Sequence, residues 1–163
     1  MIKKLILILF TFSIITSNTL GAGSDGGTKV KKLSSYDSAV KRITKAKKYE
    51  KKGKTKKAKK LYNESLKYLY KANKEKPFDP DTLNYLGFAN RKVDNLKDAE
   101  IYYLMGLEID PKHVGINEYL GELYVITNRI NLANERLEVL KGCNCEEFQE
   151  LKDVIEGKKE SKY

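Results

Sequence analysis

Apolar residues recur along most of the chain at the spacing of one helix face, and short polar breaks interrupt them. Ser34 stands three residues before Asp37, which is the spacing of a helix-capping box, so we expect the first helix to begin there. Gly53 and the pair Asp94-Asn95 lie between successive helical patterns and are expected in turns. The pattern therefore predicts an all-α chain.

Part of the chain repeats itself with a period of 34 residues. Leu86-Gly87 recurs as Leu120-Gly121 at that offset. Self-similarity at a fixed period of this size is typical of arrays in which each unit is a pair of helices. The other matched pairs are Tyr85 with Tyr119, Leu96 with Ile130, Ala99 with Ala133 and Tyr103 with Leu137.

These residues resemble the signature of the tetratricopeptide-repeat (TPR) family, which reads W-x-x-L-G-x-x-Y, then A-x-x-x-F, then P over 34 residues. In the first copy Leu83 replaces the Trp and Asn90 replaces the Tyr. In the second copy Asn117 stands at the Trp position and Cys145 at the closing Pro. The resemblance covers residues 39–145. The signature positions of the two copies are Leu83, Leu86, Gly87, Ala99, Tyr103, Pro111, Leu120, Gly121, Tyr124 and Ala133.

The signature residues have simple packing roles. Gly87 and Gly121 are expected where two helices approach closely, because a larger side chain would push the helices apart. Ala99 and Ala133 are expected to occupy the facing positions. Pro111 cannot continue a helix, so it should end its repeat.

A third copy in altered form lies upstream, where Gly53 aligns with Asp94 at an offset of 41 residues. The seven additional residues correspond to two helical turns, about 10 Å in length. We therefore expect the second helix of this copy to be long and to end near Asn73. The added turns carry Tyr68 and Tyr70 together with Leu69, and either residues 30–36 or a partner could cover them.

The sequence thus predicts a TPR solenoid of three antiparallel helix hairpins, the first with an elongated second helix, followed by a C-terminal capping helix. The cap is expected because Phe148, Leu151, Val154 and Ile155 fall on one helical face, and a repeat array needs its last apolar face covered. The expected TPR domain spans residues 34–156, with repeats over 39–79, 80–113 and 114–145, a cap over 146–156, and a fraying polar tail over 157–163.

The N-terminus has the order of regions found in secretory signal peptides. A basic leader ending at Lys4 precedes an apolar run over residues 5–15, and small and polar residues follow. We expect a signal peptide over residues 1–23, a flexible linker over 24–33, and a periplasmic or secreted protein. An uncleaved anchor is the alternative, although the run is short for a span of about 20 residues.

The TPR resemblance implies a scaffold whose inner groove holds a segment of a protein partner, and it implies no chemistry. The groove is lined by the first helix of each repeat, at positions that the packing signature leaves free. The chain does not reproduce the pattern of Lys, Asn and Arg that binds chaperone C-termini. The expected groove residues are Lys47, Glu50, Asn84, Phe88, Arg91, Lys92, Glu118, Glu122 and Ile126. For Phe88, packing beneath the long helix that precedes it is the alternative.

Charge is distributed unevenly along the chain. Residues 29–76 contain 19 Lys/Arg against 4 Asp/Glu, whereas residues 77–163 contain 11 against 17. The basic half could dock on an acidic protein, an anionic lipid surface or an anionic envelope polymer, or it could simply be a solvated helix face. Nucleic acid is disfavoured as a partner, because export would separate the protein from it.

The remaining candidate chemistry is sparse. Cys143 and Cys145 are the only cysteines, and a structural turn, a redox pair and a metal site all remain open for them. His113 is the only histidine and is expected in a loop. The sequence contains no catalytic triad motif, phosphate-binding glycine loop or HExxH run, so we expect neither an enzyme nor a cofactor or metal.

Overall fold

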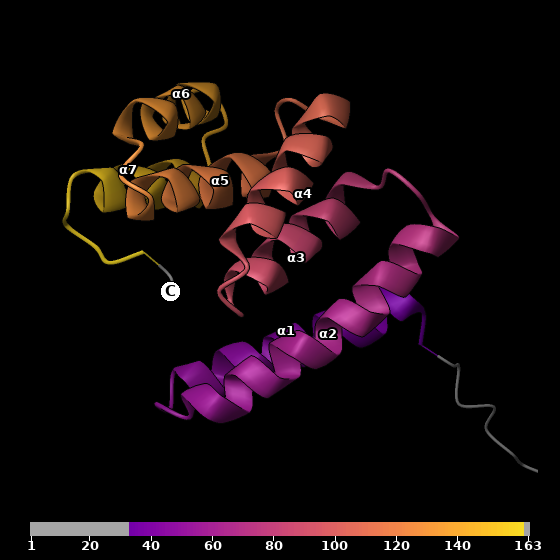
Figure 1. The fold of residues 1–163 in the computed structure, drawn as a ribbon. Helices are drawn as coiled ribbons and strands as arrows, with labels where there is room; N and C mark the ends of the chain where they lie inside the picture. Colours follow the sequence, from indigo (N-terminus) through magenta and orange to yellow (C-terminus); the bar gives the residue numbers. More distant parts are fainter. Residues whose placement is uncertain (1–32, 162–163) are drawn as a thin grey trace, which may run out of the picture. The chain divides into compact units, whose positions relative to one another are not determined.

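The computed structural model describes residues 33–161 and contains seven α-helices and no β-strand over that range. The all-α prediction is therefore confirmed for this part of the chain. The expected signal peptide, the linker up to residue 32 and the last two residues of the tail lie outside the described residues. The helices are α1 (Ser35–Glu50), α2 (Thr55–Glu75), α3 (Pro80–Arg91), α4 (Leu96–Ile109), α5 (Val114–Ile126), α6 (Ile130–Leu140) and α7 (Glu146–Ile155) (Figure 1).

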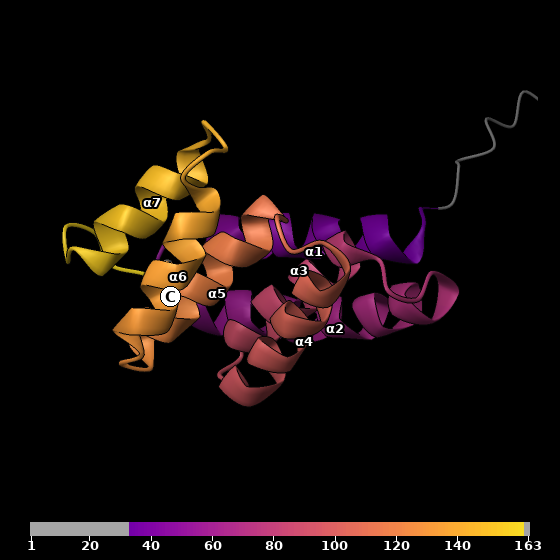
Figure 2. The same ribbon diagram turned by 90° about the horizontal axis from the view of Figure 1, so that it is seen from above.

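Consecutive helices pack in pairs, as two orthogonal views of the ribbon show (Figures 1 and 2). The main contacts join α1 with α2, α3 with α4, and α5 with α6. The odd-numbered helices also contact one another in order, from α1 through α3 and α5 to α7. Within residues 33–161 the backbones of the even-numbered helices do not approach one another in this way, although the rings of Tyr70 in α2 and Tyr102 in α4 meet. The backbones of the odd-numbered helices are therefore the ones that lie close together along the array.

The turn within each pair has the same backbone conformation in all three pairs. Gly53, Asp94 and Asn128 adopt left-handed φ angles of 66°, 69° and 58°, a region that Gly, Asp and Asn tolerate best. These positions are separated by 41 and 34 residues, which are the offsets of the sequence repeat. The next residue donates its backbone N–H to the carbonyl five positions earlier: Lys54 to Tyr49 at 2.9 Å, Asn95 to Asn90 at 2.9 Å, and Arg129 to Tyr124 at 2.7 Å.

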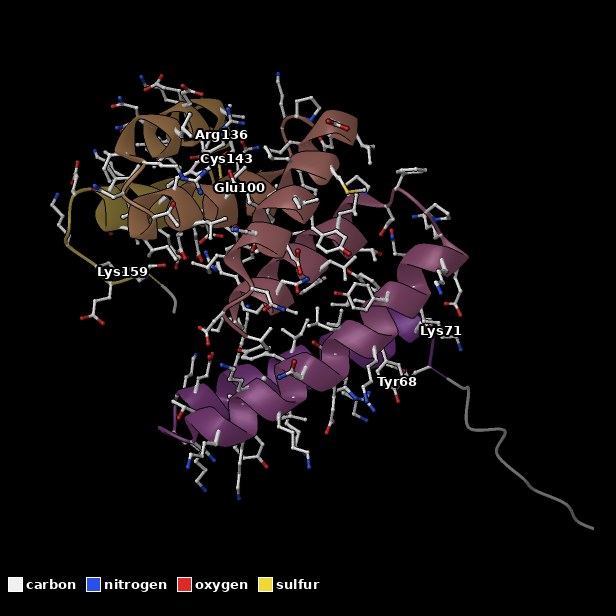
Figure 3. The ribbon with its side chains drawn as sticks, in the orientation of Figure 1. Tyr68, Lys71, Glu100, Arg136, Cys143 and Lys159 are labelled. Carbon is white, nitrogen blue, oxygen red and sulfur yellow. A yellow bond between two sulfur atoms is a disulfide. The ribbon has the colours of Figure 1, made fainter. Side chains whose placement is uncertain are left out.

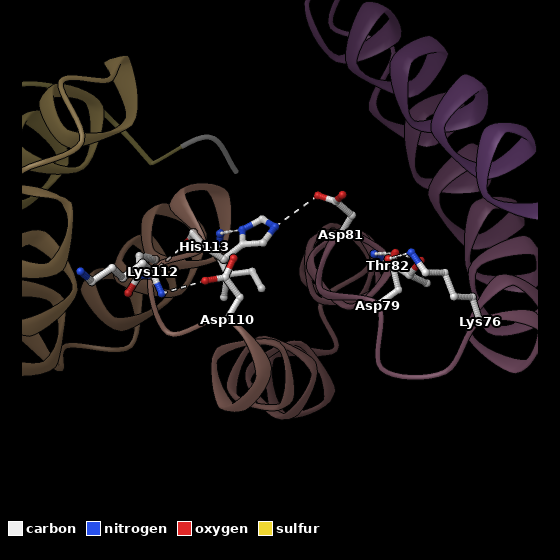
Figure 4. A network of polar contacts seen from close by, with 9 residues as sticks. Lys76, Asp79, Asp81, Thr82, Asp110, Lys112 and His113 are labelled. Atoms are coloured by element: carbon white, nitrogen blue, oxygen red, sulfur yellow. Dashed lines mark hydrogen bonds and ion pairs between the residues drawn. The ribbon is translucent and has the colours of Figure 1, made fainter.

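Two helices begin with the caps that the sequence predicts. The Ser34 hydroxyl accepts a hydrogen bond from the Asp37 N–H at 3.0 Å. The Asp79 carboxylate accepts from the Thr82 N–H at 3.0 Å and also contacts the Lys76 ammonium (Figure 4). Burial alone would raise the pKa of Asp79, but the hydrogen bonds from Lys76 and Thr82 outweigh it and lower the pKa.

The substitution Asp79→Ala should lower the free energy of unfolding by about 1 kcal/mol at neutral pH, because α3 loses its N-terminal cap. The pKa of Asp79 is lower in the folded chain, so its stabilisation is complete above the unfolded value of 3.8 and is lost as the pH falls through the folded value. Urea denaturation of both proteins between pH 7 and pH 3 measures this difference. A difference that stays constant on acidification would contradict the role of the ionised carboxylate.

Helix α2 is elongated as predicted, with 21 residues, and it ends at Glu75, two residues beyond the expected end. The guanidinium of Arg42 in α1 covers the ring of Tyr68 at 3.9 Å from its centroid and donates to its hydroxyl at 3.0 Å (Figure 3). Tyr70 is 40% exposed, and its ring centroid lies 6.3 Å from that of Tyr102 in α4. Side chains of α1 and α4 therefore supply much of the cover; of the segment expected to do so, residues 30–32 lie outside the described residues.

Two glycines mark close approaches, but their nearest neighbours differ from the expected ones. A Cβ atom at Gly87 would lie 2.5 Å from Cδ1 of the buried Tyr103 ring, and one at Gly121 would lie 2.7 Å from Cδ1 of Leu151. Ala99 and Ala133 are fully buried, as expected for signature residues, yet the atoms nearest to the glycines come from the larger side chains. Each glycine leaves a space beside its helix because it has no Cβ atom. A tyrosine ring or a leucine side chain is long enough to fill that space, whereas the methyl group of an alanine is not.

Cys143 and Cys145 form a disulfide in the turn between α6 and α7, near the labelled Cys143 of Figure 3. The bridge closes a ring around a single intervening residue, Asn144. Within residues 33–161 no group of three or more His, Cys, Asp or Glu side chains is arranged to hold a metal ion. The two cysteines are therefore bridged in this turn, a state that both the structural and the redox interpretation allow.

Candidate partner-binding site

Side chains from four helices meet in one cluster of charged and aromatic groups, which we call the inner cluster. Three of the four helices are odd-numbered, and they bring residues about one repeat apart to the same place. Six of the cluster residues are among those that the sequence analysis expects in the partner-binding groove. The inner cluster consists of Lys47 and Glu50 of α1, Tyr62 of α2, Phe88, Arg91 and the C-cap residue Lys92 of α3, and Tyr119 and Glu122 of α5.

Arg91 and Glu122 form a buried ion pair between α3 and α5. Their side chains are both 0% exposed, and Nη2 of Arg91 lies 2.9 Å from Oε2 of Glu122. The other terminal nitrogen, Nη1, donates to the Tyr119 carbonyl oxygen at 2.9 Å. A guanidinium can supply several donors in one plane, so one side chain holds both a carboxylate and a backbone oxygen of α5.

Glu50 joins three helices through its two carboxylate oxygens. Oε1 contacts the Lys92 ammonium at 2.8 Å, and Oε2 accepts a hydrogen bond from the Tyr62 hydroxyl at 2.7 Å. Burial raises the pKa of Tyr62 well above its ordinary value, and the hydrogen bond to Glu50 raises it further. Tyr62 is therefore a neutral hydrogen-bond donor at physiological pH, and the Glu50 carboxylate accepts its hydrogen bond.

Phe88 lies at the centre of the cluster and is only 2% exposed. Its ring centroid lies 5.8 Å from that of Tyr62 and 5.2 Å from that of Tyr119. The Lys47 ammonium stands 4.5 Å from the same centroid, within the range of a cation–π interaction. Of the two positions that the sequence left open for Phe88, the structure has the packed one: the ring lies between Tyr62 of the long helix α2 and Tyr119 of α5.

The substitution Phe88→Leu should lower the free energy of unfolding by about 1 kcal/mol, because it keeps most of the apolar volume but removes the ring contacts with Tyr62 and Tyr119. Thermal unfolding followed by circular dichroism measures the effect. The substitution Ile101→Leu, on the exposed surface of α4, is the matched control and should leave the melting temperature nearly unchanged. An unchanged melting temperature for Phe88→Leu would mean that the ring contacts add nothing to stability.

The other expected groove residues take different positions. Asn84 and Glu118 are buried, and the side-chain oxygen Oδ1 of Asn84 has no hydrogen-bond partner among the described residues. Ile126 is 41% exposed near the end of α5. Sequence reasoning missed Tyr62 and Tyr119 as members of the cluster. The sequence did contain one indication that Tyr119 has a structural role. Tyr119 repeats Tyr85 after 34 residues, at a position that is not part of the family signature.

The polar tail after α7 reaches the inner cluster. Gly157 adopts a left-handed φ of 70°, and the next two residues donate their N–H groups to the Asp153 carbonyl oxygen. Lys159, labelled in Figure 3, contacts Glu150 at 3.2 Å. The Ser161 hydroxyl then donates to Oε2 of Glu122 at 3.0 Å. The sequence predicted a fraying tail, but these contacts hold its described part against α7 and α5.

His113 is the N-cap residue of α5, at the loop position that the sequence predicts. Its Nδ1 accepts a hydrogen bond from the Ile116 N–H at 3.2 Å, so the proton of the neutral ring lies on Nε2. That nitrogen faces the Asp81 carboxylate at 3.2 Å (Figure 4). The ring thus links the start of α5 to the start of α3, and both of its nitrogens are used in doing so.

None of the helices within residues 33–161 combines the length and the apolar character needed to cross a bilayer. No protein-family model matches the chain, and no curated protein is significantly similar to it.

Proposed function

We propose that this protein is an exported, non-enzymatic scaffold of the TPR type, which binds a segment of a protein partner against its inner cluster. Three features support the proposal: the family signature at one fixed period, the three identical turns, and the packing of the helices in pairs followed by α7. In this proposal the three pairs are antiparallel TPR hairpins and α7 is the capping helix.

The convergence of α1, α3 and α5 on the inner cluster is the observation that carries the proposal. The cluster combines both signs of charge with the faces of Phe88, Tyr62 and Tyr119. Arg and Tyr side chains are enriched among the residues that dominate protein–protein binding energies. Lys47, Glu50 and Tyr119 are half-buried, so they are the cluster residues that an extended polypeptide could contact through its backbone and its side chains.

Capture of partners from an envelope extract tests the proposal. The chain from residue 24 to 163 is the bait, and the variant Lys47→Ala removes a cation from the inner cluster. Bands captured specifically by the unmodified chain should be lost with Lys47→Ala and retained with Lys56→Ala, which removes an equal charge from the solvent face of α2. Equal capture by all three baits would exclude the inner cluster as the binding site.

The exposed face of α2 favours a second candidate function, electrostatic binding to an anionic envelope surface or polymer. Vesicles with and without anionic lipid, sedimented at 50 mM and 300 mM salt, separate the two functions. A surface interaction should weaken steeply with salt, whereas binding in the inner cluster should weaken much less. The exposed lysines of this helix are Lys56, Lys57, Lys59, Lys60, Lys67, Lys71 and Lys74.

Export is the part of the proposal that rests on the first 23 residues alone. We expect the mature N-terminus to lie between Gly21 and Ser24, after the small residues that follow the apolar run. Intact-mass measurement of the protein recovered from the envelope fraction determines the cleavage site. A mass that still includes residues 1–15 would contradict removal of the signal peptide.

A further inference from the structure

We propose that the tail after α7, over residues 157–161, is an internal ligand of the inner cluster and competes there with the partner segment. This inference rests on the proposed function and describes how partner binding would be regulated. It starts from an observation that the polar composition of the tail did not predict: the described tail residues return from the end of α7 to a fully buried carboxylate of α5.

The path of the tail is set by backbone and side-chain contacts. The left-handed Gly157 reverses the chain, and the backbone N–H groups of Lys158 and Lys159 close the turn on the Asp153 carbonyl oxygen at 2.8 Å and 3.2 Å. The ammonium of Lys159 contacts Glu150 on the same helix. Figure 1 shows this yellow segment leaving α7 and running back along α5.

The tail meets the cluster at the atom that also binds α3. Oε2 of Glu122 accepts both from Nη2 of Arg91 at 2.9 Å and from the Ser161 hydroxyl at 3.0 Å. The hydroxyl is therefore part of the hydrogen bonding of the buried ion pair. A partner segment that reached Glu122 would have to displace this hydroxyl first.

An internal ligand lowers the apparent affinity for any competing ligand. A short tether holds its end at an effective concentration near the millimolar range, so even a weak contact is often occupied. The partner segment then binds only to the fraction of molecules whose tail is displaced. Removing the tail should increase partner affinity without changing a residue of the cluster.

A labelled peptide with the sequence KKESKY and a free carboxylate is the probe, and fluorescence anisotropy measures its binding. The chain ending at Gly157 should bind this peptide at least about tenfold more tightly than the full chain. Equal binding of the peptide by the two chains, or no binding by a folded shortened chain, would overturn the proposal.

A full-length variant keeps the test valid if the shortened chain does not fold. Ser161→Glu places a second carboxylate against Glu122 and should expel the tail, so its affinity for the peptide should rise by a similar factor. Lys56→Glu adds the same type of charge on the solvent face of α2 and should leave the affinity unchanged. Circular dichroism checks the fold of each variant, and unchanged affinity in folded Ser161→Glu would contradict the internal-ligand role.

Partner capture distinguishes the failure of this inference from that of the proposed function. If the full and shortened chains capture equal amounts of partner while Lys47→Ala captures none, the tail inference is wrong and the scaffold function stands. If the peptide binds the shortened chain but Lys47→Ala does not affect partner capture, the tail inference stands and the proposed binding site is wrong.

Discussion

Replacing Arg91 by Met should lower the free energy of unfolding by about 3–5 kcal/mol, because the substitution leaves the Glu122 carboxylate buried without its guanidinium. Both side chains of this pair are 0% exposed, so water cannot replace the lost donor without opening the contact between α3 and α5. The Tyr119 carbonyl oxygen loses a donor as well. Guanidinium chloride denaturation of the purified chain measures the loss.

Two further variants separate the loss of the pair from the loss of packing. The double variant Arg91→Met with Glu122→Leu should recover much of the stability, because it removes the buried carboxylate that lacks a cation. Arg129→Met is the matched control: Arg129 also forms an ion pair, with Glu100, but the two side chains are 35% and 25% exposed. It should cost no more than about 1 kcal/mol. A similar loss in Arg91→Met and Arg129→Met would show that burial of the Arg91 pair has no special importance.

Replacing Gly87 by Leu should lower the free energy of unfolding by about 3 kcal/mol or more, since the new side chain would overlap the Tyr103 ring. A Cβ atom alone would lie 2.5 Å from Cδ1 and 2.8 Å from Cζ of that ring. The ring is fully buried between α3 and α4, so it cannot swing into solvent to make room. Gly87→Ala should therefore destabilise the chain as well, by a smaller amount.

Gly142 offers a matched control for this overpacking. A Cβ atom at Gly142 would have no atom within 4 Å, and its φ is not left-handed, so Gly142→Ala should change stability by less than about 0.5 kcal/mol. The double variant Gly87→Ala with Tyr103→Leu should be less destabilised than the sum of the two single changes, because the smaller side chain relieves the overlap. Strict additivity would show that Tyr103 is not the side chain that opposes a larger residue at Gly87.

Local signals were enough to predict the helices and several of their ends. Ser34 and Asp79 supply side-chain caps, Gly53 and Asp94 adopt the left-handed turn conformation, and the 41-residue offset predicted the length of α2. Each of these features depends on residues close together in the chain or on a regular period. None of these features depends on a contact between residues far apart in the chain, so they can be predicted from a single sequence.

The inner cluster and the contacts of the glycines depend on long-range pairing and were predicted less well. Arg91 looks like a solvent-facing charge in sequence, and its burial follows only from a carboxylate 31 residues away on α5. Leu151 fills the space at Gly121 because α7 packs on α5, which the repeat signature does not include. The contact of Ser161 with Glu122 requires the reversal at Gly157, and polar composition alone does not specify that path.

The identical turns at Gly53, Asp94 and Asn128 have a consequence for how the chain could grow. The same backbone conformation recurs with different side chains, and the same backbone hydrogen bond supports it each time. It therefore depends little on the neighbouring sequence. A duplicated unit of residues 79–112, inserted after Lys112, would bring its own helix cap, Asp79, and its own turn at Asp94. We therefore expect the length of the array to be adjustable by gene duplication, without redesign of the units on either side.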